Sequence, residues 1–600
     1  MPVYKAPVAD MRFFLEKVLD LPAYAHLPVF ANVAGDTLEA ILTEGARLCE
    51  EVLFPLNKSG DDEGCTRHAD GSVTTPAGFK AAFQTYREGG WMAMNAPEAY
   101  GGMDMPHILG TALEEYRMAA NQAFSMYPGL TMGAVAAILA TGSEEQKSLY
   151  VPRMISGEWA GTMNLTEPHC GTDLGLIRTR AEPQADGSYA ISGTKIFISG
   201  GDQDLTDNII HLVLAKTPGA PESSKGISLF IVPKFLVNAD GSLGARNGVS
   251  CGSIEHKMGI RANATCVLNY DGATGYLVGE ENKGLAGMFV MMNAARLGVG
   301  AQGLSQGEVA YQNGVAYALD RRQGRALTGP ADPAQKADAI FVHPDVRRML
   351  MEAKVLTEGL RGLCLWGSLQ ADLAHGAETE EERTAADDLL GLLTPVIKAY
   401  CTDMGYRIAT DMQQVFGGHG YIEEQGMSQY VRDARITMIY EGTNGVQAMD
   451  LVGRKLASKG GRAVQAFFAM AAAEIAAAKG DDALADIGAR LEKSLGDMQA
   501  ATMWLMQNAM ANPDNAGAGA TAYLHITGAV VTGLMWLKMA RTAQAELARG
   551  GGDTRFLAAK LVSARFYAER ILPETGAHRR KLEAGAATLM TLTAEDFATA

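Results

Sequence analysis

The sequence has few cysteines, no excess of positive charge and no long uninterrupted hydrophobic run. Cysteine occurs only 7 times in 600 residues, and no two cysteines form a CxxC pair. An odd number of scattered cysteines is typical of reduced thiols in a cytoplasm and argues against a disulfide framework. The formal net charge of −16 argues against a nucleic-acid partner, because such a partner requires a basic surface.

Signals for export or membrane insertion are also missing. The N-terminal segment has no basic stretch followed by an apolar run and a small-residue cleavage site. The most apolar segment, residues 526–537, is too short to cross a bilayer, and we expect a buried helix there. The sequence therefore predicts a cytoplasmic protein without a membrane span.

Several common catalytic motifs are absent as well. The chain has no P-loop and no HExxH pair. Its 11 histidines are scattered without the spacing of metal ligands, so no metal site is predicted. Gly417-Gly418-His419-Gly420 follows a predicted helix, whereas the glycine-rich loop of a dinucleotide-binding fold follows a strand.

The periodicity of apolar residues divides the chain into several parts, as expected for a length that exceeds one hydrophobic core. Helical spacing dominates up to about residue 160, and short β-branched or aromatic runs separated by Gly, Pro, Asp and Asn then predict an antiparallel β domain. Helical spacing returns from residue 284 onward. The fold class is therefore α+β and mostly α, with expected domains at 1–35, 36–160, 161–282, 283–458 and 459–600.

One carboxylate stands in an unusual setting near residue 440. The segment Tyr440-Glu441-Gly442-Thr443-Asn444-Gly445 follows a short basic helix around residues 432–435. A carboxylate beside glycine backbone suits a general base that must approach a substrate closely. Taken alone, Glu441 is also compatible with an ordinary solvated loop residue.

Two upstream segments could contact a planar cofactor. The loop from Met163 to Asp173 offers backbone N–H groups and a hydroxyl to the polar edge of a ring. In the run 193–201, Phe197 and Ser199 are two residues apart in a predicted strand, so both should point to the same face. An aromatic ring and a hydroxyl there could stack on and hydrogen-bond to a heteroaromatic ring. Individually, the segments are compatible with a turn and a half-buried strand.

Together these segments resemble the acyl-CoA dehydrogenase family over about residues 90–455. The matching motifs occur in the family's order and include Leu165-Thr166-Glu167-Pro168, Gly193-Thr194-Lys195, Asp320-Arg321, Gly417-Gly418 and Tyr440-Glu441-Gly442-Thr443. Both ends of the chain are similar to a long bacterial subgroup. The resemblance implies an N-terminal helical domain, a middle antiparallel β domain, a C-terminal four-helix-bundle domain and an extra C-terminal helical domain.

The resemblance also implies an activity. Members use FAD to convert an acyl-CoA thioester to the trans-2-enoyl-CoA, and Glu441 corresponds to the base that removes the α-proton. Some relatives carry their base on an earlier helix, where this chain has Ala295, which cannot accept a proton. Within the subgroup the expected substrate is 3-(methylthio)propanoyl-CoA of dimethylsulfoniopropionate degradation. Short-, medium- or long-chain fatty acyl-CoA is the alternative.

Further site residues follow from the same resemblance. The residues matched to FAD contacts are Met163, Leu165, Thr166, Phe197, Ile198, Ser199, Arg321, Gln323, Gln414, Gly418, Thr443 and Asn444. Those matched to the acyl-CoA are Thr172, Arg296, Tyr440 and Gly442. In the family, a neighbouring subunit helps to hold the adenine-diphosphate end of FAD, so a homodimer is expected. The expected electron acceptor is electron-transferring flavoprotein.

Two alternatives remain at this stage. A flavin oxidase or monooxygenase of the same fold commonly has Asp in place of the base, so Glu441 favours the dehydrogenase. A non-catalytic scaffold that retains the fold is the second alternative. The presence of both the carboxylate and the cofactor loop favours an enzyme.

Overall fold

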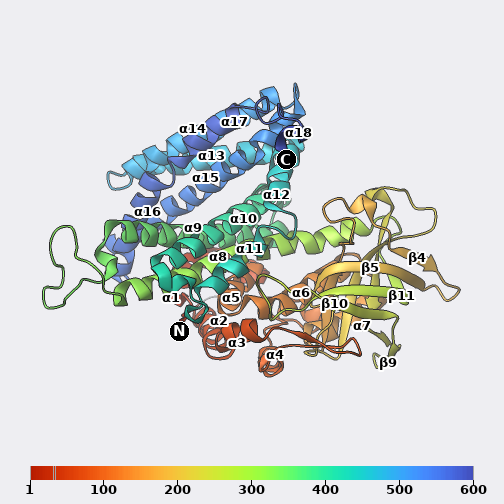
Figure 1. Cartoon of the computed structure of the whole chain (residues 1–600). Coiled ribbons are helices and arrows are strands. Elements are labelled where there is room, and N and C mark those ends of the chain that lie inside the picture. Colours follow the sequence, from red (N-terminus) through yellow and green to blue (C-terminus); the bar gives the residue numbers. More distant parts are fainter. Residues whose placement is uncertain (1, 32, 34, 599–600) are drawn as a thin grey trace. The chain divides into compact units, whose positions relative to one another are not determined.

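The computed structural model describes residues 2–31, 33 and 35–598 (Figure 1). By its internal contacts the chain forms two compact units. One unit is Glu44–Gly298, and the other combines Met1–Thr43 with Val299–Ala600. The boundaries fall inside two helices, α2 (Asp36–Leu48) and α8 (Gly284–Asp320).

The unit Glu44–Gly298 consists of a helical part followed by a β domain. Its helices are α3 (Pro55–Glu63), α4 (Phe79–Glu88), α5 (His107–Ala120), α6 (Gln122–Thr141) and α7 (Glu144–Ile155). The strands of the main sheet are β3 (Trp159–Asn164), β4 (Arg180–Pro183), β5 (Tyr189–Ser199), β6 (Asn208–Lys216), β7 (Ile227–Pro233), β10 (Val249–Ile254) and β11 (Thr265–Val278). Two short ribbons are formed by β1 (Thr66–Arg67) with β2 (Val73–Thr74) and by β8 (Phe235–Val237) with β9 (Leu243–Arg246).

The main sheet has 7 strands in the order β10-β11-β5-β4-β6-β3, and β7 pairs with both β6 and β11. Most pairs are antiparallel, as predicted. Two pairs depart from the predicted antiparallel arrangement, because β3 and β4 pair with β6 in parallel. The connection that leaves β3 passes through β4 and β5 before the chain enters β6, so it is long enough to return the chain in the same direction.

Strands β6 and β7 bury both of their faces. On β6, Ile210, Leu212 and Leu214 belong to a core that includes buried residues of α6 and α7, whereas Val213 and Ala215 belong to the core of the β domain itself. Strand β7 alternates in the same way. Burial on both faces explains why these two strands are nearly continuous hydrophobic runs in the sequence.

Sequence patterns located the strands better than they located their ends. The runs 189–191 and 195–199 belong to the single strand β5, and the runs 265–270 and 275–278 to the single strand β11. Irregular register in the β5–β11 pair interrupts the alternation and makes each strand look like two. The sequence did not predict β3, β4, β8, β9 or β10; in β3, a glycine and the preceding helix α7 hide the alternating pattern.

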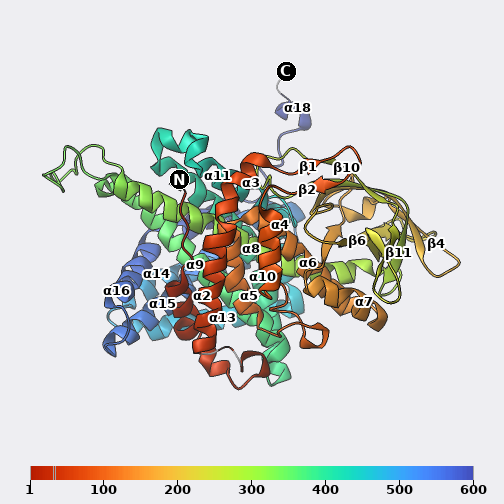
Figure 2. The ribbon, with the colours of Figure 1, turned by 90° about the horizontal axis from the view of Figure 1, so that it is seen from below.

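The second unit is almost entirely helical. Besides α1 (Val8–Arg12), its helices are α9 (Pro344–Gly376), α10 (Glu380–Val415), α11 (Met427–Thr437), α12 (Asn444–Asp450), α13 (Arg462–Lys479), α14 (Ala485–Asn508), α15 (Pro513–Ala548), α16 (Thr554–Arg570), α17 (Glu574–Glu583) and α18 (Ala594–Phe597). Glycines allow α8 and α10 to cross closely, because a Cβ on Gly405 would lie 2.0 Å from the carbonyl oxygen of Gly303. Helix α9 contacts α10, α15 and α16 (Figure 2).

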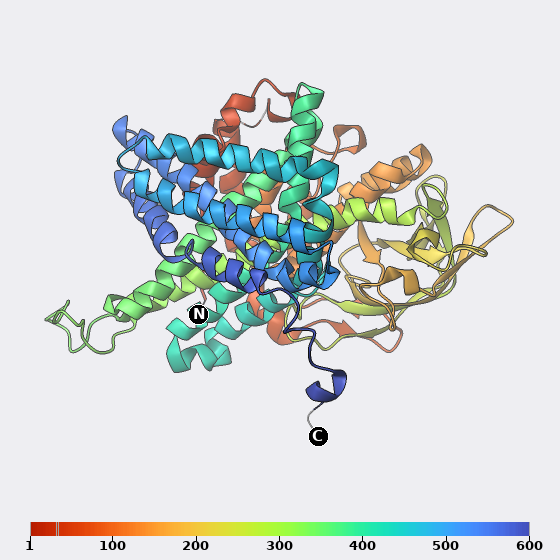
Figure 3. The same cartoon turned by 90° about the horizontal axis from the view of Figure 1, so that it is seen from above.

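Helices α13 to α17 form the C-terminal extension of this unit and lie side by side (Figure 3). By length and composition alone α6, α8 and α15 could each cross a membrane. The segment 526–537 is part of the 36-residue helix α15, so the prediction that it is too short was wrong. However, 83% of the most apolar window of α15 is buried inside the protein, and packing therefore accounts for its hydrophobicity.

A buried group of charges joins both ends of the chain to the core of this unit. Asp10 of α1 accepts hydrogen bonds from Arg361 of α9 and from Lys560 of α16. Arg361 also donates to Glu308 of α8 at 2.6 Å, and Lys560 donates to Glu358 of α9 at 2.8 Å. With Lys354, which pairs with Glu358, the group contains three cations and three carboxylates. We refer to these six residues as the charge cluster.

The charge cluster is shielded from water. The side chains of Arg361 and Lys560 are each 2% exposed, and the Lys560 ammonium lies 4.9 Å from the ring centre of Phe556. Burial alone would raise the pKa of the Asp10 carboxyl, but Lys560 and Arg361 outweigh it and lower this pKa to about 2. The stabilisation linked to ionised Asp10 is therefore present above about pH 4 and is lost as the pH falls through about 2.

Replacing Lys560 should destabilise the protein strongly. Lys560→Met leaves Asp10 and Glu358 each with one cation fewer in a dry environment. We expect the free energy of unfolding to fall by about 3–5 kcal/mol, measured by urea denaturation.

The matched control is Lys479→Met, which removes an exposed ion pair to Glu492 at 2.8 Å in the same extension. This variant should lose less than about 1 kcal/mol. Equal losses in the two variants would show that the charge cluster is no more important than a surface ion pair.

Candidate active site

The loop between α11 and α12 holds its central residues in an uncommon conformation. Glu441 has φ 57° and Gly442 has φ 82°, so two consecutive residues are left-handed. Thr443 then caps α12, its hydroxyl accepting from the N–H of Val446 at 3.3 Å. A Cβ at residue 442 would lie 2.6 Å from Nε2 of Gln447, so this position requires glycine for space as well as for its φ.

Gln447 supports the loop from within α12. It is fully buried, and its Nε2 donates to the carbonyl oxygens of both Glu441 and Gly442 at 3.3 Å. The amide thereby holds the two left-handed residues from one side. The sequence analysis missed this role, because a glutamine in a short helix carries no signal for it.

Asn444 anchors the loop to helix α10. Its Oδ1 accepts from Lys398 at 2.8 Å, and its Nδ2 donates to Thr402 at 2.9 Å and to Asp403 at 2.7 Å. The backbone N–H of Asn444 donates to the carbonyl of Met438 at 3.1 Å and closes the loop. Since its side-chain amide is engaged within the protein, the cofactor contact assigned to Asn444 would have to come from its backbone.

Tyr440 is held against helix α8. Its hydroxyl donates to Oε1 of Gln302, which is itself buried. Burial, and to a lesser extent the neighbouring Glu441 charge, raises the pKa of Tyr440. The phenol therefore remains protonated beside Glu441 and can act as a hydrogen-bond donor but not as a base.

In the other unit, a buried ion pair fixes the loop that follows β3. Lys195 of β5 is fully buried and donates to the carbonyl of Leu165 at 3.0 Å and to Glu167 at 2.8 Å. Glu167 also accepts from the N–H and hydroxyl of Thr179 at 3.1 and 2.6 Å. Burial opposes ionisation of Glu167, but Lys195 and these hydrogen bonds outweigh it and lower its pKa. Both residues belong to the motifs of the family resemblance, but nothing in the sequence indicates that they pair.

Phe197 lies at an irregularity of β5. The register shifts between the pairs Cys266–Ile198 and Leu268–Lys195, and Phe197 has φ 61°. As a result Lys195 and Ile198 are both buried, whereas Phe197 between them is 59% exposed. Simple alternation would have placed Phe197 on the same side as Lys195. The bulge instead presents its ring to the exterior of this unit, with Ser199 only partly buried.

The other residues predicted for this part of the cofactor site differ in what they can offer. Ile198 belongs to the core of the β domain, and Met163 and Leu165 pack against the core shared with α6 and α7. These three can contribute mainly backbone groups. Thr166 is partly buried and its carbonyl accepts from Ile196 at 2.9 Å, while Thr172 is exposed.

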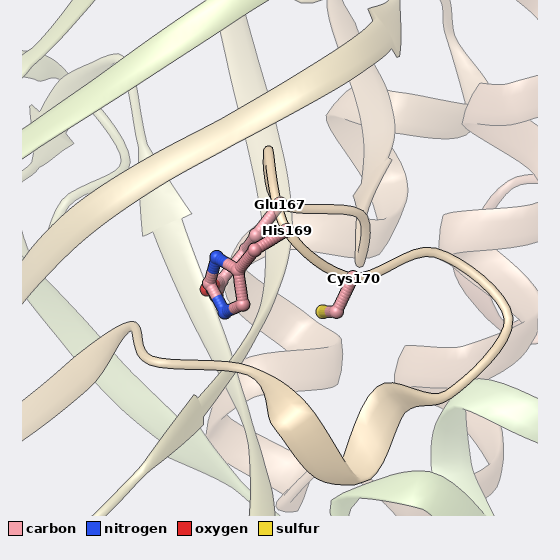
Figure 4. Close-up of side chains that lie close together, drawn as sticks. All are labelled: Glu167, His169 and Cys170. Carbon is pink, nitrogen blue, oxygen red and sulfur yellow. The ribbon is translucent and has the colours of Figure 1, made fainter.

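Glu167, His169 and Cys170 are the one group of potential metal ligands found among the described residues (Figure 4). Their nearest ligand atoms lie within 4.8 Å of one another. However, Nε2 of His169 lies 2.8 Å from the carbonyl oxygen of Leu176, which can only accept, so this nitrogen carries the proton. Glu167 is neutralised by Lys195, and burial raises the pKa of the Cys170 thiol. We therefore assign no metal to this group.

The resemblance assigns four of the matched residues to the adenine-diphosphate end of FAD, and they gather where α8 and α10 end: Arg321, Gln323, Gln414 and Gly418. The ring of Tyr317 stacks on Phe416 at 4.1 Å, and its hydroxyl is 2.8 Å from Nδ1 of His419. These contacts bring Arg321, which follows α8, to the same end of the helices as Gln414 and Gly418. Both Gln414 and Gly418 are exposed, and a Cβ on Gly418 would meet no atom within 4 Å.

The loop after Arg321 is organised by a residue that the sequence analysis missed. Asp338 is fully buried and accepts from the backbone N–H groups of Ala326 and Asp332 at 2.9 Å and from Arg325 at 3.2 Å. These hydrogen bonds hold the pKa of Asp338 far below its usual range. The backbone N–H of Gln323 donates to the Asp338 carbonyl at 3.0 Å. Gln323 itself is exposed, unlike Asp338.

Arg296 lies on the part of α8 that belongs to the unit Glu44–Gly298. It is 7% exposed, and its guanidinium donates to Asn293 at 3.3 Å. Ala295, its neighbour, supplies no proton acceptor.

Models of known families match nearly the whole chain. Residues 39–158, 162–273 and 282–456 match the N-terminal, middle and C-terminal domains of acyl-CoA dehydrogenase, and residues 463–593 match an acetyl-CoA dehydrogenase C-terminal-like domain. A 3-methylmercaptopropionyl-CoA dehydrogenase from Ruegeria pomeroyi is 44% identical over 98% of this chain and 99% of its own length. A broad-specificity linear acyl-CoA dehydrogenase from Mycobacterium tuberculosis is 36% identical over 97% and 98%.

Solved structures share the fold. An acyl-CoA dehydrogenase from Bacillus anthracis, complexed with FAD, has a TM-score of 0.74 at 20% identity and covers 92% of this chain and 88% of its own. Caenorhabditis elegans ACDH-11, in complex with C11-CoA, has a TM-score of 0.76 at 18% identity and covers 99% and 96%. The chain therefore belongs to the acyl-CoA dehydrogenase family, in the form that carries an additional C-terminal domain.

Proposed function

We propose that the acyl-CoA dehydrogenation performed by this chain acts on 3-(methylthio)propanoyl-CoA, with FAD as cofactor and Glu441 as the base. Such a reaction would serve dimethylsulfoniopropionate degradation. The support for this substrate is the 44% identity to the Ruegeria pomeroyi relative over nearly the whole chain. The second candidate is a fatty acyl-CoA, because relatives with that activity are also similar over their full length.

The observation that carries the assignment of the base is the backbone conformation of Glu441. Among the described residues, seven other than glycine have positive φ, and both Glu441 and Phe197 are among them. Such conformations cost about 1–3 kcal/mol each and persist where the surrounding structure holds them, often at functional sites. Two residues matched to the site by sequence alone therefore carry independent signs of constraint.

Glu441 would accept the proton from the α-carbon of the substrate. A C–H bond beside a thioester is a weak acid, so the carbonyl oxygen must be stabilised as negative charge develops on it. By family likeness, the backbone N–H of Glu441 is one of the donors to this oxygen. Exclusion of water by the bound acyl chain should strengthen the electrostatic interactions around the carboxylate and the carbonyl.

The residues present fit FAD. When bound, FAD supplies the acceptor for the hydride that leaves the β-carbon. The exposed ring of Phe197 offers a stacking surface, and Thr166 and Ser199 offer hydroxyls on the neighbouring chain segments. At the end of α8 and α10, Arg321 can form a bidentate contact with a pyrophosphate, and the open backbone at Gly418 allows close approach.

Family likeness supplies the remaining proposals. Electrons would pass from the reduced cofactor to electron-transferring flavoprotein, and the enzyme would act as a cytoplasmic homodimer. The exposure of Gln414 and Gly418 in the single chain agrees with a role at a subunit contact. Sedimentation of the FAD-loaded protein tests this point, since a fully active monomer would contradict it.

Substitution of the base tests the mechanism. Glu441→Gln keeps the size of the side chain but cannot accept the α-proton. We expect this variant to retain its yellow cofactor and to lose about 10²–10⁴-fold in the rate of anaerobic flavin reduction by substrate. The control is Glu424→Gln, at an exposed glutamate in the turn before α11. The flavin of this variant should be reduced by substrate at the normal rate. Rapid bleaching in the Glu441 variant would place the base elsewhere.

A panel of CoA esters tests the substrate. At equal, low ester concentration, the flavin should be bleached anaerobically faster by 3-(methylthio)propanoyl-CoA than by butyryl-, octanoyl- or palmitoyl-CoA. A higher kcat/KM for one of the fatty esters would replace the proposed substrate with that chain length. Stoichiometric peroxide formation during turnover in air would instead identify an oxidase.

Replacing Phe197 should weaken cofactor binding. Phe197→Leu removes the ring but leaves the protein core intact, because this side chain is 59% exposed. A stacked aromatic contributes about 0.5–1.5 kcal/mol, so the dissociation constant of FAD should rise about 2- to 10-fold in titrations of the apoprotein. The control is Phe235→Leu, at a half-buried phenylalanine in the β8–β9 ribbon. Equal FAD affinity in both variants would remove Phe197 from the site.

A further inference from the structure

The C-terminal extension contacts the helices that carry the catalytic loop. Helix α12, which begins immediately after the loop, packs against both α10 and α15 (Figure 1). Helix α15 belongs to the extension, whereas α10 belongs to the domain that contains Glu441. The extension can therefore influence the loop through α12, without contacting the loop residues that face the substrate.

A chain of three polar side chains runs from the loop to the extension. Asn444 donates to Oδ1 of Asp403 on α10 at 2.7 Å, and Oδ2 of the same carboxylate is 3.0 Å from Nε2 of His525 on α15. A carboxylate oxygen accepts, so the His525 Nε2 that faces Asp403 is assigned as the donor. Asp403 thus receives one hydrogen bond from the loop and one from the extension.

Asn444, the first residue of α12, is the point at which these three side chains can act on the loop. Lys398 donates to its amide oxygen at 2.8 Å while Asp403 accepts from its amide nitrogen, so the two charges fix the orientation of the amide. Asn444 also closes the loop through its bond to the Met438 carbonyl. Because only two residues separate Asn444 from Glu441, a shift of the amide should move the base.

The surroundings of His525 keep its ring in place. The imidazole stacks on His578 of α17 with ring centres 5.2 Å apart and meets the buried Tyr400 of α10 edge-on at 5.8 Å. The side chains of His525 and Asp403 are 17% and 18% exposed, so water screens their contact only partly. Burial, with a smaller effect of His525 and Lys581, lowers the pKa of His578 to about 4, which leaves His578 uncharged near neutral pH.

We propose that His525 of the C-terminal extension is a positioning residue for the dehydrogenation, acting through Asp403 and Asn444 on the loop that carries Glu441. This inference rests on the proposed role of Glu441. A well-placed base and a base displaced by about 1 Å can differ by about 10²-fold in rate. The extension would therefore contribute to the rate of proton removal without contacting the substrate.

The test compares three variants of the full-length enzyme. His525→Leu removes the hydrogen bond at similar size, and His525→Gln retains an N–H that can donate to Asp403. Tyr523→Phe, two residues away on α15, removes a buried hydrogen bond to Thr502 of α14 that has no link to the loop. The measured quantities are FAD content, the limiting rate of anaerobic flavin reduction, the substrate concentration at half-maximal rate, and hydrogen–deuterium exchange of peptides covering 438–444.

The proposal expects a specific pattern. His525→Leu should slow the limiting rate about 10- to 100-fold with FAD content and half-saturation unchanged, and should accelerate exchange in 438–444. His525→Gln should recover to within about 3-fold of the normal rate, and Tyr523→Phe should show the normal rate and exchange. A normal limiting rate in His525→Leu, or an equal loss in Tyr523→Phe, would overturn the proposal.

Hydrogen–deuterium exchange tests the role of His525 independently of the proposed dehydrogenation. If no CoA ester reduces the native enzyme, the proposed function fails and the rates carry no information. Exchange in 438–444 then decides alone, since it needs no substrate. Faster exchange in His525→Leu than in Tyr523→Phe supports the link from the extension to the loop, and equal exchange refutes it.

Discussion

The charge cluster is the constraint on which the helical unit depends. Asp10, Arg361 and Lys560 come from three helices that are far apart in sequence, and Glu308 adds a fourth. Each charge is tolerated in a dry interior only because its partners are in place. Any other relative position of the four helices would leave a buried charge unpaired and is therefore disfavoured. A short N-terminal helix and the C-terminal extension therefore belong to the same core as the helices near the active-site loop.

The sequence revealed the parts of the site that depend on local chemistry. Glu441 and Gly442 were recognisable because a carboxylate stands beside glycine and because a family motif surrounds them, whereas their left-handed backbone was not predicted. Strand alternation predicted a common face for Phe197 and Ser199, but it could not predict the bulge that turns Phe197 away from the buried side of Lys195. Strands β5, β6, β7 and β11 were identified from their apolar runs, but β3, β4, β8, β9, β10 and the parallel pairs were not.

The residues that hold the site were much harder to find. Asn444 and Asp403 are separated by 41 positions, and His525 lies 122 positions from Asp403. Lys195 and Glu167 are 28 positions apart and look like ordinary surface residues in the sequence. No local pattern marks such pairs, because their pairing is decided by how helices and strands pack. Helix length was misjudged for a related reason, since the polar ends of α15 hide its extent.

The left-handed turn at Glu441 has a consequence for how this enzyme could change its chemistry. Aspartate and asparagine adopt positive φ more readily than glutamate does, so the backbone would accept either of them without strain. Aspartate would withdraw the carboxylate by one methylene, and asparagine would abolish it. A substitution at this one position, which for aspartate needs only a single nucleotide change, would thus alter the reactivity of the site while the fold stays the same.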